Sequence, residues 1–286
     1  AKATKGLDIF DISNTSDIKL VGRFDTAGSS YDVALSSDGK TAYLADLSNG
    51  LVIVDISTPS APGLVGSFDT AGNARGVRIS SDEQTAYIAD DSNGLVVIDI
   101  STPGTPSLIG SYDSVGAARG LSISSDGQTA YLADGSNGLV IVNISTPTTP
   151  SLTGTYDTAG NSSAVSISGD GQTAYLADGT SGLVIVDIST PGTPSLIGSY
   201  NSAGNSYDLR LSNDEQTVYL TDWGSGLALV DISTPGTPSL IGSYDSDGSA
   251  YKVSISSDEQ TAYLVDYTNG FALVDISTPG SPSLIS

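Results

Sequence analysis

Seven side chains stand out as candidates for chemistry in this chain of 286 residues, because they break an otherwise regular pattern. Aromatic rings beside polar groups suit stacking on sugars or anchoring a protein, and arginine pairs bidentately with carboxylates. The aromatic residues are Tyr31, Tyr207, Trp223, Tyr251 and Tyr267, and the arginines are Arg75 and Arg119. The chain has no Cys and no His, which excludes thiolate nucleophiles, imidazole bases and metals held by either residue.

The pattern that these residues break is a repeat of 44 residues. The string GLVIVDIS and its close variants recur without insertion or deletion, and all 12 prolines fall on two positions of the same period. Such regularity predicts one repeated architecture rather than independent domains. The strings begin at Gly6, Gly50, Gly94, Gly138, Gly182, Gly226 and Gly270.

Each period holds four short β-rich runs, which we name strands A to D. In the second repeat these are residues 76–82, 85–90, 94–101 and 106–114, separated by Gly, Asp, Asn and Pro turn residues. Strand C is apolar at consecutive positions, which favours a strand covered on both faces. Radial stacking of four-stranded sheets provides that cover. The sequence therefore predicts an all-β propeller of four-stranded antiparallel blades.

The motifs GLVIVDIS, TAYLAD and TPxxPxLIGSYDT together resemble the LVIVD-repeat family, which is related to YVTN-type surface-layer propellers. The resemblance covers essentially the whole chain. It implies a propeller from a bacterial or archaeal surface or secreted protein, and it brings no catalytic motif. We therefore expect an extracellular or cell-surface location.

The strand count leaves half a blade unexplained. We predict a single domain over 1–286, with an N-terminal half blade of strands C and D at 6–26 and six full blades at 27–286. Strand A begins near Asp32, Gly76, Gly120, Ala164, Asp208 and Lys252. Either a six-bladed ring has a spare hairpin, or a seventh blade has lost its inner strands, or a neighbouring chain supplies the missing pair of strands. The ring would also have seven blades if the chain is an excised fragment of a longer array. A spare hairpin with open edges would allow self-association.

The aromatic and arginine exceptions map to one end of the blades. Tyr31, Arg75, Arg119, Tyr207 and Tyr251 precede strand A, in the D–A link, whereas Trp223 and Tyr267 occupy the B–C turn. In an antiparallel blade these two loops lie at the same end of the sheet. We therefore expect a ligand-binding face, although these side chains could instead simply cover the loop backbone.

Charged residues also interrupt strand A, which would line the centre of a propeller. They are Asp32, Arg78, Asp208, Arg210 and Lys252. Four further basic residues lie in or directly before the half blade, in a chain of net charge −22; they are Lys2, Lys5, Lys19 and Arg23. One interpretation is a central site for an anionic group, and the other is pairwise neutralisation of the acids.

The acidic residues predict structure more than function. Most recur once per blade at turns, so they are dispersed rather than gathered, and no cofactor is expected. Asp245-Ser246-Asp247-Gly248 is a weak calcium candidate because calcium needs six to eight converging oxygens. The excess negative charge disfavours nucleic acid, and no apolar run is long enough for membrane insertion.

These features favour a non-catalytic binding or scaffold propeller that presents one face to a glycan or a protein. A structural subunit that assembles through the extra hairpin is an alternative. A lactonase or lyase-type enzyme is a further one, with Asp32, Asp208, Arg210 and Tyr207 or Tyr251 as acid, base and anion-binding groups. Without His, such an enzyme would need a buried carboxylate of raised pKa as its base.

Overall fold

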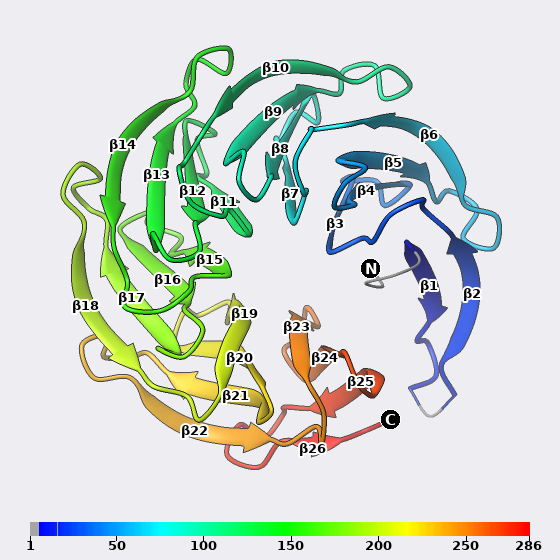
Figure 1. Cartoon of the computed structure of the whole chain (residues 1–286). Helices are drawn as coiled ribbons and strands as arrows, with labels where there is room; N and C mark the ends of the chain where they lie inside the picture. The colour runs from blue at the N-terminus through cyan, green and yellow to red at the C-terminus, as the bar shows by residue number, and fades with distance from the viewer. Residues whose placement is uncertain (1–5, 16) are drawn as a thin grey trace. The chain divides into compact units, whose positions relative to one another are not determined.

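The computed structural model of the chain describes residues 6–15 and 17–286. These residues form strands and turns without any helix, and no segment among them is a candidate membrane-spanning helix. Lys2 and Lys5 lie outside the described residues. The fold is a β-propeller of six four-stranded antiparallel blades, as predicted, with an additional two-stranded sheet (Figure 1). We number the blades 1 to 6 in chain order.

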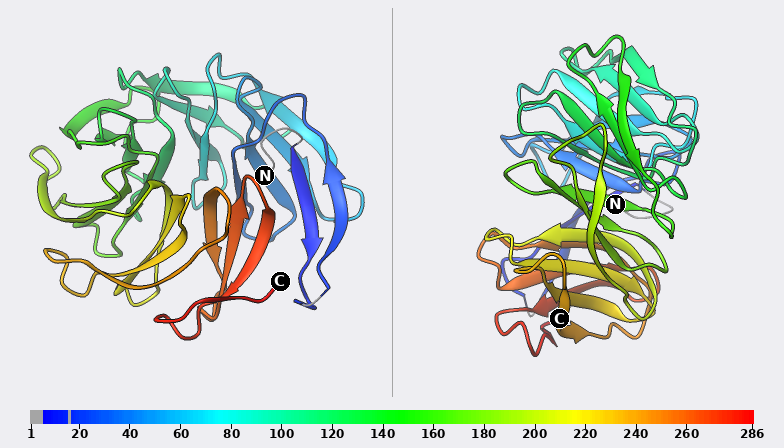
Figure 2. Two further views of the ribbon diagram at one scale, coloured as in Figure 1. Left: turned by 60° about the horizontal axis from the view of Figure 1, so that its bottom comes forward. Right: turned by 90° about the vertical axis from the view of Figure 1, so that its left-hand side faces the viewer.

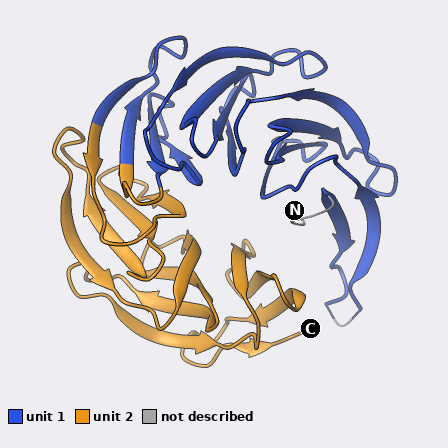
Figure 3. Cartoon of the chain, viewed as in Figure 1, with its two compact units in different colours: residues 1–134, 140–153 blue, residues 135–139, 154–286 orange. Residues whose placement is uncertain are grey.

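The chain forms two compact units, shown in separate colours in Figure 3 and considered separately below. Unit 1 comprises Ala1–Asp134 and Val140–Thr153, and unit 2 comprises Gly135–Leu139 and Gly154–Ser286. The assignment of one domain over 1–286 stays a prediction. The boundary passes through blade 3, so blades 1 and 2 belong to unit 1 and blades 4 to 6 to unit 2.

The strands of every blade pair in the order A, B, C, D. The half blade has β1 (Leu7–Asp11) and β2 (Lys19–Phe24); blade 1 has β3 (Asp32–Leu35), β4 (Thr41–Ala45), β5 (Leu51–Asp55) and β6 (Gly63–Phe68); blade 2 has β7 (Gly76–Ile79), β8 (Thr85–Ala89), β9 (Leu95–Asp99) and β10 (Ser107–Tyr112); blade 3 has β11 (Gly120–Ile123), β12 (Thr129–Ala133), β13 (Leu139–Asn143) and β14 (Ser151–Tyr156).

The remaining blades follow the same plan, with longer A and B strands in blades 5 and 6. Blade 4 has β15 (Ala164–Ile167), β16 (Thr173–Ala177), β17 (Leu183–Asp187) and β18 (Ser195–Tyr200); blade 5 has β19 (Asn205–Leu211), β20 (Thr217–Trp223), β21 (Gly226–Asp231) and β22 (Ser239–Tyr244); blade 6 has β23 (Ala250–Ile255), β24 (Thr261–Asp266), β25 (Gly270–Asp275) and β26 (Ser283–Leu284). Figure 2 shows these sheets from two further directions.

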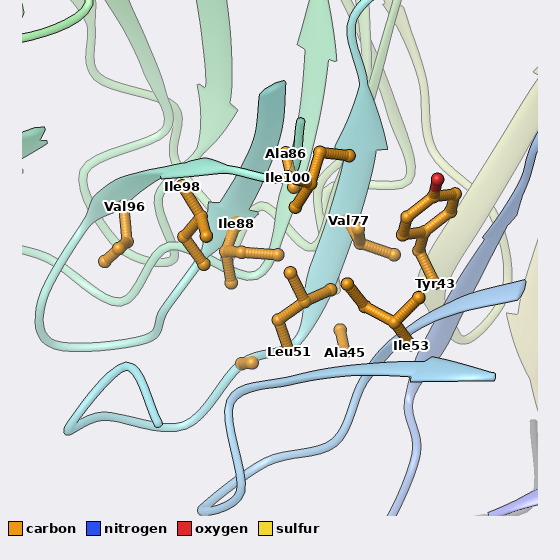
Figure 4. Packing of buried hydrophobic residues seen from close by; sticks show 11 residues of the cluster. Tyr43, Ala45, Leu51, Ile53, Val77, Ala86, Ile88, Val96, Ile98 and Ile100 are labelled. Atoms are coloured by element: carbon orange, nitrogen blue, oxygen red, sulfur yellow. The ribbon is translucent and has the colours of Figure 1, made fainter. Parts of the chain in front are cut away.

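The hydrophobic core lies between neighbouring blades. Leu51 and Ile53 of blade 1 pack with Val77 and Ile88 of blade 2, and all four are fully buried (Figure 4). Strand C can be apolar at consecutive positions because it is covered on both faces. Its alternate residues point to opposite faces of the sheet, toward the neighbouring sheet on each side. Tyr43 of strand B belongs to the same cluster, so this tyrosine packs between blades.

Glycine in strand D permits close approach of the next blade. A Cβ atom on Gly66 would overlap the carbonyl oxygen of Pro103 in the C–D turn of blade 2. The same relationship recurs between Gly198 of blade 4 and Pro235 of blade 5. The repeated Gly and the repeated Thr-Pro turn are thus two halves of one contact between blades.

The half blade is a separate two-stranded sheet. Its strand β1 pairs with β2, and Leu7 packs on Leu44 and Val54 of blade 1. Blade 6 contains its own C and D strands, because β25 pairs with both β24 and a shortened β26. The expected extra C–D hairpin is therefore confirmed. In it, Arg23 Nε lies 2.6 Å from Asp8 Oδ1, at cross-strand positions that are Val52 and Ser67 in blade 1.

Candidate functional site

The B–C turn of one blade is joined to the D–A link of the next. In unit 1, Leu47 N donates to Ala74 O and Ala74 N donates to Leu47 O, each over 3.0 Å. In unit 2, Gly179 pairs with Ser206 and Trp223 with Ser249 in the same way. Within each unit the two kinds of loop therefore share one end of the sheets, where the sequence predicted a ligand face.

Blades 5 and 6 depart from the other blades at this end. In blades 1 to 4 the first strand-A residue opposes an alanine of strand B, as Asp32 opposes Ala45. In blade 5, Tyr207 and Asp208 together oppose the single residue Thr221, so strand β19 contains a β-bulge. Strand β23 has an irregularity at Tyr251. Bulges redirect side chains at a sheet end, and both of these lie at tyrosines that were predicted to bind ligand.

A hydroxyl group holds the bulge in blade 5. Thr221 Oγ1 accepts a hydrogen bond from Asp208 N over 2.9 Å and lies 3.3 Å from Asp208 O, as donor. Thr221 is fully buried, and alanine occupies its position in blades 1 to 4. The residues at that position are Ala45, Ala89, Ala133 and Ala177. Thr221 is thus a positioning residue for Tyr207.

Four aromatic rings form a contiguous chain in unit 2, which we call the aromatic cluster: Tyr251, Tyr207, Trp223 and Tyr267. The ring centroids are 5.3 Å apart for Tyr251 and Tyr207, 5.4 Å for Tyr207 and Trp223, and 5.9 Å for Trp223 and Tyr267. The planes are tilted by 42°, 50° and 35° in that order. Tyr267 is 65% exposed and the other three are half-buried, so the cluster reaches solvent.

The B–C turns of blades 5 and 6 are built to carry large side chains. In blades 1 to 4 the corresponding residue has a left-handed backbone, with φ of 43° at Leu47 and 51° at Asp91. Trp223 instead ends the regular strand β20 and pairs with Asn205, and the positive φ of 100° moves to Gly224. Because bulky residues are strained at positive φ, this change of turn is what admits the indole.

Unit 1 holds a different arrangement at the equivalent positions. The Arg75 guanidinium carbon lies 5.5 Å from the centroid of the Tyr31 ring, and Arg75 Nη2 lies 3.2 Å from Asp91 Oδ2. Arg119 occupies the same position one repeat later, and in its repeat Gly135 stands at the sequence position of Asp91. Of the predicted aromatic residues, Tyr31 is therefore placed with an arginine in unit 1.

The two strand-A aspartates, Asp32 and Asp208, each accept a hydrogen bond from a backbone N–H of the next blade. Asp208 is 1% exposed, its Oδ2 accepts from Val253 N of blade 6, and its Oδ1 accepts from Arg210 Nη1 over 3.1 Å. Asp32 Oδ2 accepts in the same way from Val77 N of blade 2 and from Arg78 Nη1. Pairwise neutralisation thus accounts for these four charged residues. Lys252 is half-buried in strand β23.

The aspartate at the end of strand B connects two loops of its blade by hydrogen bonds. These are the D–A link that precedes the blade and the B–C turn. Asp90 is fully buried and accepts from Thr70 Oγ1 and Asn93 Nδ2. Burial raises the pKa of Asp90 above its ordinary value, against the lowering effect of these hydrogen bonds. Asp222 departs from this arrangement, because its Oδ1 has no hydrogen-bond partner among the described residues.

The weak calcium candidate forms a turn. Asp247 N donates to Asp245 Oδ1 over 2.9 Å, and Asp247 has a left-handed backbone with φ of 53°. Residues 6–15 and 17–286 contain no group of three or more Asp, Glu, His or Cys residues arranged to hold a metal ion. The prediction of no cofactor stays untested.

Solved structures of low sequence identity resemble this chain in fold. The solved structures that resemble this chain include the periplasmic gluconolactonase PpgL of Pseudomonas aeruginosa, with a TM-score of 0.84, 13% identity and coverage of 98% of this chain and 91% of that one. A putative 6-phosphogluconolactonase of Bacteroides fragilis has a TM-score of 0.80 at 17% identity, with 100% and 91% covered. A functionally unknown protein of Desulfotomaculum acetoxidans has a TM-score of 0.74 at 16% identity, with 96% and 90% covered. At these identities the likeness extends to the fold alone.

The sequence itself defines the family. The LVIVD repeat model matches residues 1–26, 27–70, 71–114, 115–158, 159–202, 203–246 and 247–286. The chain therefore belongs to the LVIVD repeat family, as the motifs indicated. These boundaries reproduce the period of 44 residues and the partial first repeat. No curated protein matches the sequence.

Proposed function

We propose that this propeller is a non-catalytic binding module that holds a carbohydrate on the aromatic cluster of unit 2. The observation that carries the proposal is the contiguous chain of rings from Tyr251 through Tyr207 and Trp223 to Tyr267. Isolated aromatic residues that merely cover loop backbone need no mutual contact. Here a bulge at Tyr207 and a changed turn at Trp223 bring the rings together.

Carbohydrate suits this surface for a chemical reason. The apolar C–H faces of sugar rings pack on aromatic rings, while the tyrosine hydroxyls and the indole N–H supply hydrogen bonds at the ring edges. Four rings in succession could hold several sugar units of one chain. The net charge of −22 favours a neutral or cationic polysaccharide over a polyanionic one at this cluster. A secreted or cell-surface location belongs to the same proposal.

The lactonase-like reading has one supporting observation, the resemblance of the fold to gluconolactonases. The proposed catalytic carboxylates are nevertheless already engaged. Asp208 uses Oδ2 for Val253 N and Oδ1 for Arg210, and Asp32 uses Oδ2 for Val77 N and Arg78. This favours a structural role for both. Acceleration of gluconolactone hydrolysis that is lost in Asp208→Asn would overturn the non-catalytic proposal.

Assembly through the half blade is a separate question. Strand β1 lies at the edge of a two-stranded sheet, and edges recruit strands. Light scattering over a range of protein concentrations tests it, because self-association would raise the mass with concentration. A constant monomer mass would remove this alternative.

The binding proposal is tested by affinity electrophoresis through gels that contain neutral polysaccharides. We expect one or more of them to retard the protein. The double variant Trp223→Ala, Tyr267→Ala should lose the retardation. Leu196→Ala, which truncates a 53% exposed side chain on strand β18, is the matched control and should migrate like the parent. Equal retardation of the double variant and the parent would contradict the proposal.

A further inference from the structure

Two arginines in the D–A links of blades 2 and 3, Arg75 and Arg119, have buried N–H groups without a hydrogen-bond acceptor among the described residues. Arg75 is half-buried, its guanidinium carbon lies 5.5 Å from the centroid of the Tyr31 ring, and only its Nη2 meets a carboxylate oxygen, Asp91 Oδ2, at 3.2 Å. Arg75 Nε is buried and has no hydrogen-bond partner among the described residues. The ion pair is thus monodentate and leaves donors unused.

Arg119 lacks even that partner. Its Nε is also buried without a hydrogen-bond acceptor, and within the described ranges no acidic side chain forms an ion pair with it. Gly135 stands where blade 2 has Asp91. Unpaired N–H groups of a partly buried cation are costly, and such groups in native proteins call for an unseen acceptor.

The repeat predicts that the two arginines lie side by side, and a Cβ built on Gly76, next to Arg75, would lie 3.2 Å from Arg119 O. Equivalent side chains of neighbouring blades meet at this position, because Tyr31 and Arg75 lie 5.5 Å apart and Tyr207 and Tyr251 lie 5.3 Å apart. Arg119 follows Arg75 by the same 44 residues. Of these two guanidinium groups, only that of Arg75 forms an ion pair with a carboxylate, that of Asp91, among the described residues.

Four aspartates of the same two repeats are engaged by other groups. Asp90 and Asp134 are fully buried and accept from Thr70 Oγ1 and Ser114 Oγ. Asp69 and Asp113 accept from the backbone N–H groups of their own links, at Ala71 and Val115. These carboxylates do not neutralise the arginines directly, but their charge would repel a dianion more strongly than a monoanion.

We propose that Arg75 and Arg119 form a subsite for a planar, singly charged carboxylate, such as that of a uronic acid. A carboxylate matches the fork of a guanidinium group and can accept from two arginines at once. The subsite lies in unit 1 and shares no residue with the aromatic cluster. Its failure and that of the carbohydrate proposal are therefore separately measurable.

The test is a nitrogen–proton NMR titration of the ¹⁵N-labelled full chain with sodium glucuronate, with glucose as the uncharged control. We expect glucuronate to shift the Nε–H signals of Arg75 and Arg119, which are assigned from Arg75→Gln and Arg119→Gln. Glucose should leave both signals in place. Arg119→Gln should weaken binding about tenfold, as expected for loss of a hydrogen bond to a charged group. Arg119→Lys keeps the positive charge but not the forked guanidinium group. Its affinity for glucuronate should lie between those of the parent and of Arg119→Gln.

Several outcomes would overturn the proposal. They are an absence of shifts, equal shifts with glucose, or an unchanged glucuronate affinity in Arg119→Gln. A lower saturating concentration for inorganic phosphate than for glucuronate would contradict the assignment to a singly charged carboxylate. If Arg119→Gln does not fold, Arg75→Gln gives the same test from the other side of the subsite.

Discussion

The Tyr207 ring lies 5.4 Å from the Trp223 ring, although the two residues are 16 apart in sequence and belong to the paired strands β19 and β20. Two local irregularities make this contact. The bulge at Tyr207 and Asp208 changes the direction of strand β19, and the altered B–C turn keeps Trp223 in an extended backbone. The candidate site is therefore a consequence of backbone departures that blades 1 to 4 lack.

The first prediction concerns the positioning residue Thr221. Thr221→Ala removes the acceptor for Asp208 N, which holds the bulge at Tyr207, but changes none of the four aromatic residues of the cluster. We expect the affinity for the bound polysaccharide to fall by about two- to tenfold, the equivalent of one hydrogen bond. Calorimetric titration measures the change. Thr237→Ala, in the exposed C–D turn of the same blade, is the control, and equal affinities of the two variants would refute the role of Thr221.

The second prediction concerns Asp208, the buried aspartate that links blade 5 to blade 6 by a hydrogen bond. Asp208→Ala removes the carboxylate that accepts hydrogen bonds from Val253 N and Arg210 Nη1, which should lower the free energy of unfolding by about 2–4 kcal/mol. Urea denaturation measures this loss. Asp157→Ala, at an exposed position of unit 2, should change stability by less than about 0.5 kcal/mol. A fully stable Asp208→Ala would argue against the structural role assigned to this carboxylate.

The third prediction compares two glycines of strand β6. A Cβ on Gly66 would overlap Pro103 O, whereas a Cβ on Gly63 would meet nothing within 4 Å. Gly66→Ala should therefore destabilise the protein by about 1–3 kcal/mol, and Gly63→Ala should be close to neutral. Thermal unfolding of both variants checks this. Similar transition temperatures would show that the close approach of neighbouring blades is not required.

The fourth prediction concerns pH. The Ser80 hydroxyl and the Gln84 backbone N–H hold the pKa of Asp82 below its ordinary value of 3.8, and an equivalent serine does so for Asp214. A lowered folded-state pKa contributes stability above the unfolded-state pKa, and this stability is lost as the pH falls through the folded-state pKa. The stability difference between the parent and Asp82→Asn should therefore shrink on acidification below pH 3.8.

For Asp90 the pH dependence of stability should have the opposite sign. Burial raises its folded-state pKa, so protonation on acidification stabilises the parent relative to Asp90→Asn. Urea unfolding midpoints at neutral and acidic pH distinguish the two variants. Parallel pH profiles for Asp82→Asn and Asp90→Asn would contradict the environments described for these carboxylates.

The repeat made most of the fold predictable. Strand A was expected to begin near Asp32, Gly76, Gly120 and Ala164, and the structure places the starts of β3, β7, β11 and β15 at those residues. Each prediction rested on turn residues that recur at a fixed interval. The extra C–D hairpin followed from the same count of repeats, so a local signal sufficed.

Strands β19 and β23 begin two to three residues before the expected starts near Asp208 and Lys252. Strand β19 begins at Asn205 and β23 at Ala250. The reason is that residues before each irregularity also pair with strand B, as Asn205 does with Trp223 and Ala250 with Asp266. A bulge depends on a tertiary contact, here the Thr221 hydroxyl with Asp208 N, which no local propensity records. The available signal was the replacement of a repeated alanine by Thr221. Likewise, the mutual contact of the aromatic rings depends on packing between blades 5 and 6.

The central claim is that a carbohydrate occupies the aromatic cluster, and Trp223 offers a direct probe because it is the single tryptophan of the chain. The measurement is the fluorescence of Trp223 during titration with the polysaccharide that retards the protein in gels. We predict a saturable change in emission whose midpoint equals the dissociation constant from calorimetry. Calorimetric binding without any change in Trp223 emission would contradict the account, because the ligand would then lie elsewhere.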